Sequence, residues 1–119
     1  MVFEEMLSSA VKQEASDIFL VVGQPVSFKI DGVIEKQEEE SLKPDQVKEL
    51  VDQMYEMAQR DTSNRRNGDD DFSISLASVG RFRVNIFKQR GSWSAVLRVV
   101  AFDLPDVSKM GIPQTVLDL

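Results

Sequence analysis

Residues 80–100 read GRFRVNIFKQRGSWSAVLRVV, and this stretch determines the fold of the chain. In its first half, every second residue is large and apolar: Phe82, Val84 and Ile86. After Arg90-Gly91 the same alternation returns, at Trp93, Ala95, Leu97 and Val99. A period of two is typical of a strand with one buried face. The stretch therefore predicts an antiparallel β-hairpin with one apolar face.

The register of this hairpin follows from matching its two apolar faces. Placing Phe82 opposite Val99 requires a loop with an even number of residues, either the two-residue turn Arg90-Gly91 or a four-residue loop over residues 89–92. A three-residue loop would put the two faces out of phase unless a bulge corrected it. The same register places Arg83 directly opposite Arg98 on the second face, with Arg81 two residues along.

These facing arginines need an explanation, because like charges directly opposite each other destabilise a sheet. One interpretation is an anionic ligand held by several guanidinium groups. The other is a neighbouring carboxylate from this acidic chain, or simple exposure to water, and structural ion pairs outnumber ligand sites. The residues alone leave both interpretations open.

Composition excludes several classes of function. The 119 residues suffice for one domain with its own core. The net charge of −6 argues against bulk binding of nucleic acid. The chain has no Cys and no His, so it lacks disulfides, thiolate catalysis, cysteine metal sites and the usual general base. No apolar run approaches the roughly 18 residues of a membrane span, and the first residues do not resemble a signal peptide. We therefore expect a cytoplasmic protein without a transmembrane segment.

The remaining segments predict two helices and four further strands. Apolar stripes with helical spacing predict helices over residues 2–14 and about 44–59. Short apolar or alternating runs predict strands, at residues 18–22, 26–30, 33–36 and 72–77. The order α-βββ-α-βββ, with tight turns between strands, predicts an α+β domain. We expect an antiparallel sheet of about six strands with two helices packed on one face.

Asp69, Asp70 and Asp71 form an acidic run that invites a metal interpretation. The run lacks the alternating ligand spacing and the distal Glu of an EF-hand loop. An enzyme based on these carboxylates also lacks a second convergent element. We expect structural or solvated acids here, with no metal site and no catalytic residue in this chain.

Several ordered motifs resemble one known family. They are Ala15-Ser16-Asp17-Ile18, Val22-Gly23, Ile30-Asp31-Gly32, Asp71-Phe72-Ser73, GRFRVN over residues 80–85, and Leu97-Arg98. Together they resemble the N-terminal domain of twitching-motility (type IV pilus retraction) ATPases, in the type II and type IV secretion ATPase superfamily. The resemblance covers nearly the whole chain.

The sequence departs from the family pattern at three points. Phe19 stands where the family usually has a histidine, and Lys29 where it usually has an arginine. No G-x-x-x-x-G-K-[ST] occurs, so this chain alone should neither bind ATP tightly nor hydrolyse it. The resemblance implies a PAS-like N-terminal domain over residues 1–102 and an interdomain linker over residues 103–119. We expect the P-loop ATPase domain to follow Leu119.

The resemblance also implies a role in a homohexameric ATPase. The domain would close over ATP and Mg held by the C-terminal domain and would contact the neighbouring subunit, which couples hydrolysis to motion. Arg81, Arg83 and Arg98 would reach the phosphates, with Arg90 a weaker candidate, because guanidinium groups suit phosphate oxygens and act as arginine fingers.

The same resemblance bears on where the protein works. It implies a position at the inner membrane, peripheral to it, beside pilus or secretion machinery. The start at the first helix favours retraction over pilus assembly or type II secretion. The alternative is a free-standing PAS-like sensor module that binds a small ligand or a partner protein.

Overall fold

The structure, a computed structural model, describes residues 2–102 and contains six strands, two α-helices and a short 3₁₀ helix. The helices are α1 (Phe3–Lys12), α2 (Pro44–Ala58) and the 3₁₀ helix η1 (Thr62–Arg65). The strands are β1 (Asp17–Leu20), β2 (Ser27–Ile30), β3 (Val33–Lys36), β4 (Asp69–Leu76), β5 (Gly80–Gln89) and β6 (Ser92–Phe102). The predicted order of helices and strands is thus confirmed, whereas η1 was not predicted. The predicted linker over residues 103–119 lies outside the described residues.

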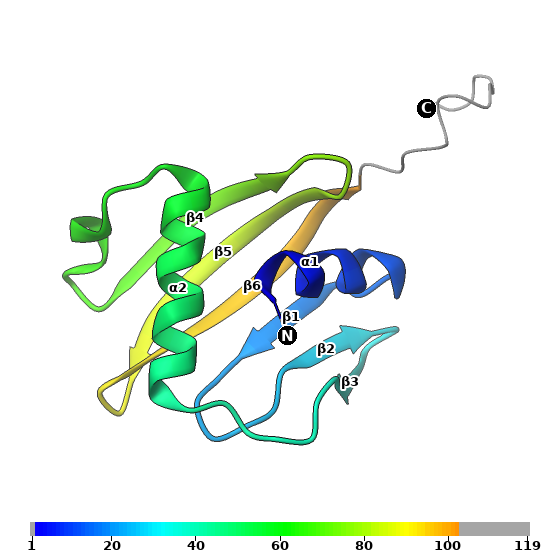
Figure 1. The fold of residues 1–119 in the computed structure, drawn as a ribbon, viewed down its shortest axis with the longest axis horizontal. Coiled ribbons are helices and arrows are strands. Elements are labelled where there is room, and N and C mark those ends of the chain that lie inside the picture. The colour runs from blue at the N-terminus through cyan, green and yellow to red at the C-terminus, as the bar shows by residue number, and fades with distance from the viewer. Residues whose placement is uncertain (1, 103–119) are drawn as a thin grey trace.

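All six strands form one antiparallel sheet in the order β3-β2-β1-β6-β5-β4. Each half of the chain contributes three strands joined by short connections, and β1 and β6 join the two halves at the centre of the sheet. Both α-helices cover the same face of the sheet (Figure 1). The fold is therefore the α+β arrangement that the sequence predicts.

The β5–β6 hairpin has the register that matches its two apolar faces. Phe82 pairs with Val99 and Arg83 pairs with Arg98. The strands are joined by Arg90 and Gly91 alone, with φ angles of 55° and 79°. Positive φ at both positions is the type I′ turn, whose twist matches that of antiparallel strands. The four-residue loop is thus excluded. A β-bulge between Arg81 and Phe82 shifts the register at the far end of the hairpin.

The hydrophobic core lies between the helices and the face of the sheet that they cover. Alternate residues of the central strands enter it, including Ile18, Phe82 and Leu97, each with no exposed surface. The apolar stripe of α1 and that of α2 pack onto this layer. Burying an aliphatic or aromatic side chain contributes about 1.5–3 kcal/mol, so this layer supplies most of the stability. The opposite face of the sheet, called the open face below, carries no helix (Figure 1).

The connection between α2 and β4 is held by arginines. The Arg65 guanidinium lies over the Tyr55 ring at 5.1 Å and over the Trp93 ring at 5.3 Å. Its Nη2 lies 2.9 Å from Asp52 Oδ1 in an ion pair. Burial alone would raise the pKa of Asp52, but hydrogen bonds from Lys48 and Arg65 bring it below its usual value. These contacts dock η1 against the end of α2 and the β5–β6 hairpin.

The three aspartates of the acidic run begin β4 and point alternately to its two sides. Asp70 lies on the helix side, where Arg60 donates to its two carboxylate oxygens at 2.8 and 2.7 Å and the Tyr55 hydroxyl donates at 2.6 Å. The hydrogen bonds from Arg60 lower the pKa of Asp70 to about 2, and burial together with the Asp70 carboxylate raises the pKa of Tyr55. Asp70 is thus a structural acid, as expected.

Strand β3 forms one edge of the sheet, and all four of its residues are exposed. Val33 and Ile34 are 57% and 56% exposed. Since β2 pairs with only one side of β3, the other side presents its backbone N–H and C=O groups to solvent. Neither α-helix of residues 2–102 has the length and apolar character needed to cross a membrane.

Candidate functional site

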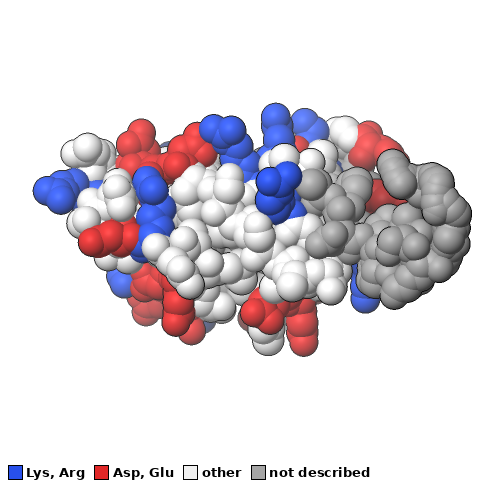
Figure 2. All heavy atoms as spheres, turned by 90° about the horizontal axis from the view of Figure 1, so that it is seen from above, with Lys and Arg blue, Asp and Glu red and all other residues white. Residues whose placement is uncertain are grey.

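The open face of the sheet carries the predicted site residues. Along β5, buried residues alternate with exposed ones, so that Arg81 and Arg83 project from the open face while Phe82 and Val84 enter the core. Arg98 projects from the same face of β6, because it pairs with Arg83. Figure 2 shows Lys and Arg side chains along the upper side of that view, with Asp and Glu side chains beside them. The structure therefore brings the three predicted arginines onto one solvent-facing surface.

Arg83 and Arg98 lie directly opposite each other, as the register predicts. Each is paired with a carboxylate from a neighbouring strand. Arg83 donates through Nε and Nη2 to the two oxygens of Asp71, both at 3.3 Å. Arg98 Nε donates to Asp17 Oδ1 at 3.2 Å. Within residues 2–102, the repulsion between the two guanidinium groups is thus offset by neighbouring acids, which is the second of the two interpretations that the sequence left open.

The two ion pairs differ in burial. The side chains of Arg83 and Asp71 are 64% and 50% exposed, so water and salt screen their attraction and the pair contributes at most about 1 kcal/mol. The Arg98 side chain is 72% exposed, but that of Asp17 is only 9% exposed and also accepts a hydrogen bond from the Ser16 hydroxyl at 2.8 Å. Asp17 is therefore a fixed anchor, whereas the guanidinium groups remain available to solvent.

A row of charges crosses the middle of the open face. Lys29 of β2 pairs with Asp17 of β1, Asp17 pairs with Arg98 of β6, and Arg98 pairs with Arg83 of β5. Sequence reasoning missed the contribution of Lys29 and Asp17 to this row. An acid at the start of an apolar strand was the available signal, but it does not reveal that β1 lies beside β6, which is about 80 residues further along the chain.

Arg81 and Arg90 differ from the facing pair. Arg81 projects from the open face beyond the bulge, and no acid within residues 2–102 forms an ion pair with it. Arg90 lies in the β5–β6 turn, about 20 Å along the strand from Arg83 at roughly 3.3 Å per residue. The structure thus groups Arg81, Arg83 and Arg98, and it places Arg90 elsewhere.

The grouped arginines can bind an anion with several oxygens. Guanidinium groups donate paired hydrogen bonds in a fixed planar geometry that matches phosphate. In the part of the chain described, no group of three or more acids lies close enough to hold a metal ion. The arrangement therefore suits phosphate recognition by side chains.

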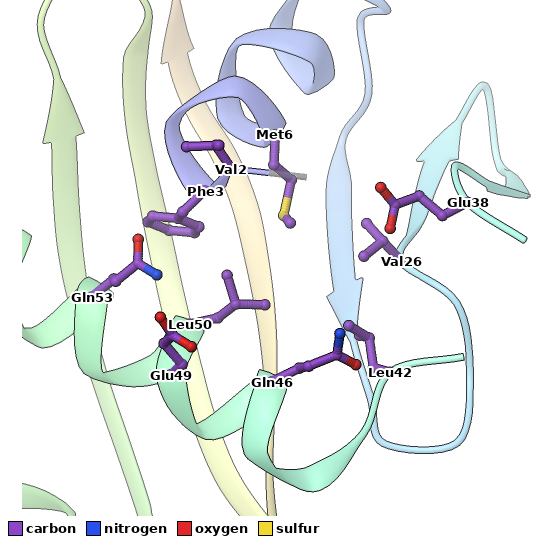
Figure 3. A pocket seen from close by; sticks show the side chains of 10 residues that line it. All are labelled: Val2, Phe3, Met6, Val26, Glu38, Leu42, Gln46, Glu49, Leu50 and Gln53. Atoms are coloured by element: carbon purple, nitrogen blue, oxygen red, sulfur yellow. The ribbon is translucent and has the colours of Figure 1, made fainter. Parts of the chain in front are cut away.

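A separate hollow of about 420 Å³ lies on the helix side of the sheet, between α1 and α2. Figure 3 shows side chains of α1 and α2 pointing toward one another across it. Its floor is apolar, and carboxylate and carboxamide groups surround it; the lining residues are Val2, Phe3, Met6, Val26, Glu38, Leu42, Gln46, Glu49, Leu50 and Gln53. Apolar walls with a few polar groups are typical of small-molecule sites.

The sequence matches a known family over almost its full length. The family described as "Type II/IV secretion system protein" matches residues 1–118. The type IV pilus ATPase PilU of Pseudomonas aeruginosa is 34% identical over 115 residues, which cover 96% of this chain and 30% of PilU. The type IV pilus retraction ATPase PilT of the same organism is 31% identical over 109 residues, which cover 91% of this chain and 31% of PilT.

Solved structures show the same relationship. The crystal structure of the pilus retraction motor PilT with bound ADP superposes with a TM-score of 0.69 at 34% identity, over 94% of this chain and 33% of that chain. The ATPase DotB of Legionella pneumophila has a TM-score of 0.62 at 23% identity, which shows a shared fold. The chain thus spans about a third of the length of the relatives that it matches.

Proposed function

Since the chain belongs to the type II/IV secretion system protein family and fits an N-terminal domain of a type IV pilus ATPase, we propose that it gates nucleotide turnover in such a motor. ATP and Mg are held by a C-terminal ATPase domain, which the chain's own sequence does not supply because it contains no phosphate-binding loop. The chain is a PAS-like domain that closes over this nucleotide.

The facing pair Arg83 and Arg98 carries this proposal. The pair is solvent-facing, it is held only by weak or one-sided ion pairs, and Arg81 lies beside it. When the domain closes, phosphate oxygens replace the Asp71 carboxylate as the acceptor for Arg83, and Arg98 turns from Asp17 toward the same phosphates. Charge stabilisation of this kind is worth roughly 10³–10⁵ in rate in other phosphoryl-transfer enzymes. The crystal structure of PilT contains bound ADP, which supports the use of nucleotide by a related motor.

Coupling to motion follows from the exchange of acceptors. The arginines would bind phosphate before hydrolysis and return to Asp17 and Asp71 once the phosphate has left, so that each turnover opens and closes the domain. Contact with a neighbouring subunit in a homohexamer would pass this movement around the ring. We propose the cytoplasmic side of the inner membrane as the location, with pilus retraction machinery as the partner.

The test uses the longer protein that includes the ATPase domain. Arg83→Ala and Arg98→Ala should each lower steady-state ATP turnover by at least tenfold, while circular dichroism shows an unchanged fold. Arg66→Ala is the matched control, because it removes an exposed arginine from the η1 segment, away from the open face. Unchanged turnover in both open-face variants would contradict the nucleotide role.

The hollow between α1 and α2 favours a second candidate, a sensor that binds a small ligand. Its apolar floor and acidic rim suit a small cation with an apolar body. Leu50→Trp should fill this space and abolish binding of such compounds in a thermal-shift screen, without changing ATP turnover in the longer protein. A turnover change in Leu50→Trp would instead connect the hollow with the motor.

A further inference from the structure

A second hollow lies on the open face at the other end of the β5–β6 hairpin from the arginine pair. Its volume is about 460 Å³, and it lies between the β5–β6 turn and the segment that follows β1. Figure 1 shows the β5–β6 turn at the end of the sheet opposite to the β4–β5 turn. Val21 and Val22 form its apolar wall, and the polar lining residues are Gln24, Gln89, Arg90, Ser92 and Ser94.

The polar side chains that line this hollow have no partners within the described chain. None of the five makes a side-chain hydrogen bond or ion pair with another residue of the range 2–102. Ser94 is only 2% exposed as a residue, and its hydroxyl opens onto the hollow instead of being sealed in the interior. The hydroxyl, carboxamide and guanidinium groups of the lining are therefore free to hydrogen-bond a polar ligand that enters the hollow.

The charge of the residues that line the hollow indicates which class of ligand it binds. Arg90 is cationic, and no acid lines the hollow, although the whole chain carries a net charge of −6. The other four side chains are hydroxyls and carboxamides, which donate hydrogen bonds to oxygen. One guanidinium group and several neutral donors around a small space suit an oxyanion.

The turn itself does not explain why an arginine occupies position 90. A type I′ turn favours Asn, Asp or Gly at its first central position, where φ is positive. The β2–β3 turn follows this preference with Asp31-Gly32, at φ angles of 51° and 80°. The β5–β6 turn instead holds Arg90 at a φ of 55°, which is unfavourable for a long side chain. The two turns have nearly the same positive φ angles, and turn preference alone does not account for an arginine at position 90.

We propose that this hollow binds a small phosphate-bearing anion, with Arg90 pairing with its charge and Ser94, Ser92 and the two glutamines donating hydrogen bonds to its oxygens. The site shares no residue with the row of Arg83, Arg98 and Asp17. Phosphate binding in this hollow is therefore independent of the proposed contact between the open-face arginines and the nucleotide of an ATPase domain.

The test is a titration of the ¹⁵N-labelled 119-residue chain, followed by backbone amide shifts at constant ionic strength. The probes are inorganic phosphate and pyrophosphate, with sodium chloride as the reference salt. Saturable shifts at Gly91, Ser92 and Ser94 are expected. Stronger binding of pyrophosphate would identify a phosphorylated small molecule as the guest, and equal binding would identify free phosphate.

Two variants and one control complete the test. Arg90→Asn keeps a residue that the turn favours, and Ser94→Ala removes one hydroxyl; each should weaken binding at least tenfold. Arg66→Gln removes an exposed positive charge elsewhere, and it should leave the saturable shifts at Gly91, Ser92 and Ser94 unchanged. Shifts that grow linearly with phosphate, shifts confined to Arg81, Arg83 and Arg98, or unchanged binding in Arg90→Asn would overturn the proposal.

Discussion

Asp70 shows how the stability of this chain depends on the environment of a single acid. Its side chain is 8% exposed and accepts hydrogen bonds from Arg60 and Tyr55, which hold its carboxylate in the charged form. Its pKa of about 2 lies below the ordinary value of 3.8. Asp70 therefore stabilises the fold above about pH 4, and this contribution is lost as the pH falls toward 2, with a magnitude of about 2 kcal/mol.

Replacing Asp70 by Asn should remove this pH dependence. We expect Asp70→Asn to lower the free energy of unfolding by about 2 kcal/mol at pH 7 and to reduce the further loss between pH 4 and pH 2. Urea unfolding followed by the fluorescence of Trp93 measures both quantities. Asp69→Asn is the control, because Asp69 is exposed and has no ion pair with another described residue. An identical pH slope in Asp70→Asn and in the parent chain would contradict this account.

At the residue scale, the sequence predicted half of the charged row on the open face. The facing of Arg83 and Arg98 followed from parity alone, since an even turn leaves one possible register for the apolar faces. The acidic partners of these two arginines could not be predicted from the register. Asp71 belonged to a run that was expected to be structural or solvated, without a named partner, and the role of Asp17 depends on β1 lying beside β6. Local alternation contains no information on such a distant pairing.

At the scale of the elements, the β2–β3 hairpin depends on the conformation of one turn. Gly32 has a φ of 80°, and no atom lies within 4 Å of the position that a Cβ would take. Gly32→Ala should therefore destabilise the chain through backbone strain alone, by about 1–2 kcal/mol. The shift of the urea midpoint at constant m-value measures it.

Asp31→Asn is the matched variant in the same turn, and we expect it not to destabilise the chain. Asn-Gly is the pair that a type I′ turn favours, and Asn tolerates the φ of 51° that Asp31 adopts. Asp31→Asn should leave the urea midpoint unchanged or raise it slightly. A midpoint that falls equally in both variants would show that this turn does not control the hairpin.

Most helices and strands could be predicted from the sequence, whereas η1 could not. Apolar stripes predicted α1 and α2 to within two residues at each end. Alternation predicted β5 and β6, whereas β4 begins at Asp69, three residues before the strand predicted over residues 72–77. The segment over residues 60–70 is polar and lacks any period, so it read as an irregular connection. Its structure comes from Arg65 between Tyr55 and Trp93, and from Arg60 over Phe72. Because these are tertiary contacts, no local sequence pattern predicts them.

At the scale of the whole molecule, β1 and β6 hold the two halves of the chain together. Leu97 of β6 has no exposed surface and lies at this junction, opposite Ile18 on one side and Val84 on the other. Leu97→Ala should cost about 2–5 kcal/mol through lost contacts and the cavity that remains. Urea unfolding measures this cost.

Val100 is the control on the same strand. It is 57% exposed, so Val100→Ala should change the free energy of unfolding by less than about 0.5 kcal/mol. A loss in Leu97→Ala no larger than that in Val100→Ala would show that the two halves are held together elsewhere. Strand order was the part of the fold that the sequence left unpredicted, because pairing between β1 and β6 arises only when both halves have formed.

The exposed edge at β3 also affects how readily the isolated chain aggregates in solution. Val33 and Ile34 lie on an apolar strand with one unpaired edge, to which the strand of another molecule can add. At pH 7 the net charge of −6 keeps molecules apart, and Glu38, Glu39 and Glu40 lie shortly after the end of β3 at Lys36. Near the isoelectric point of about 4.6 this repulsion vanishes. Storage and crystallisation conditions close to that pH therefore favour stacking of molecules edge to edge.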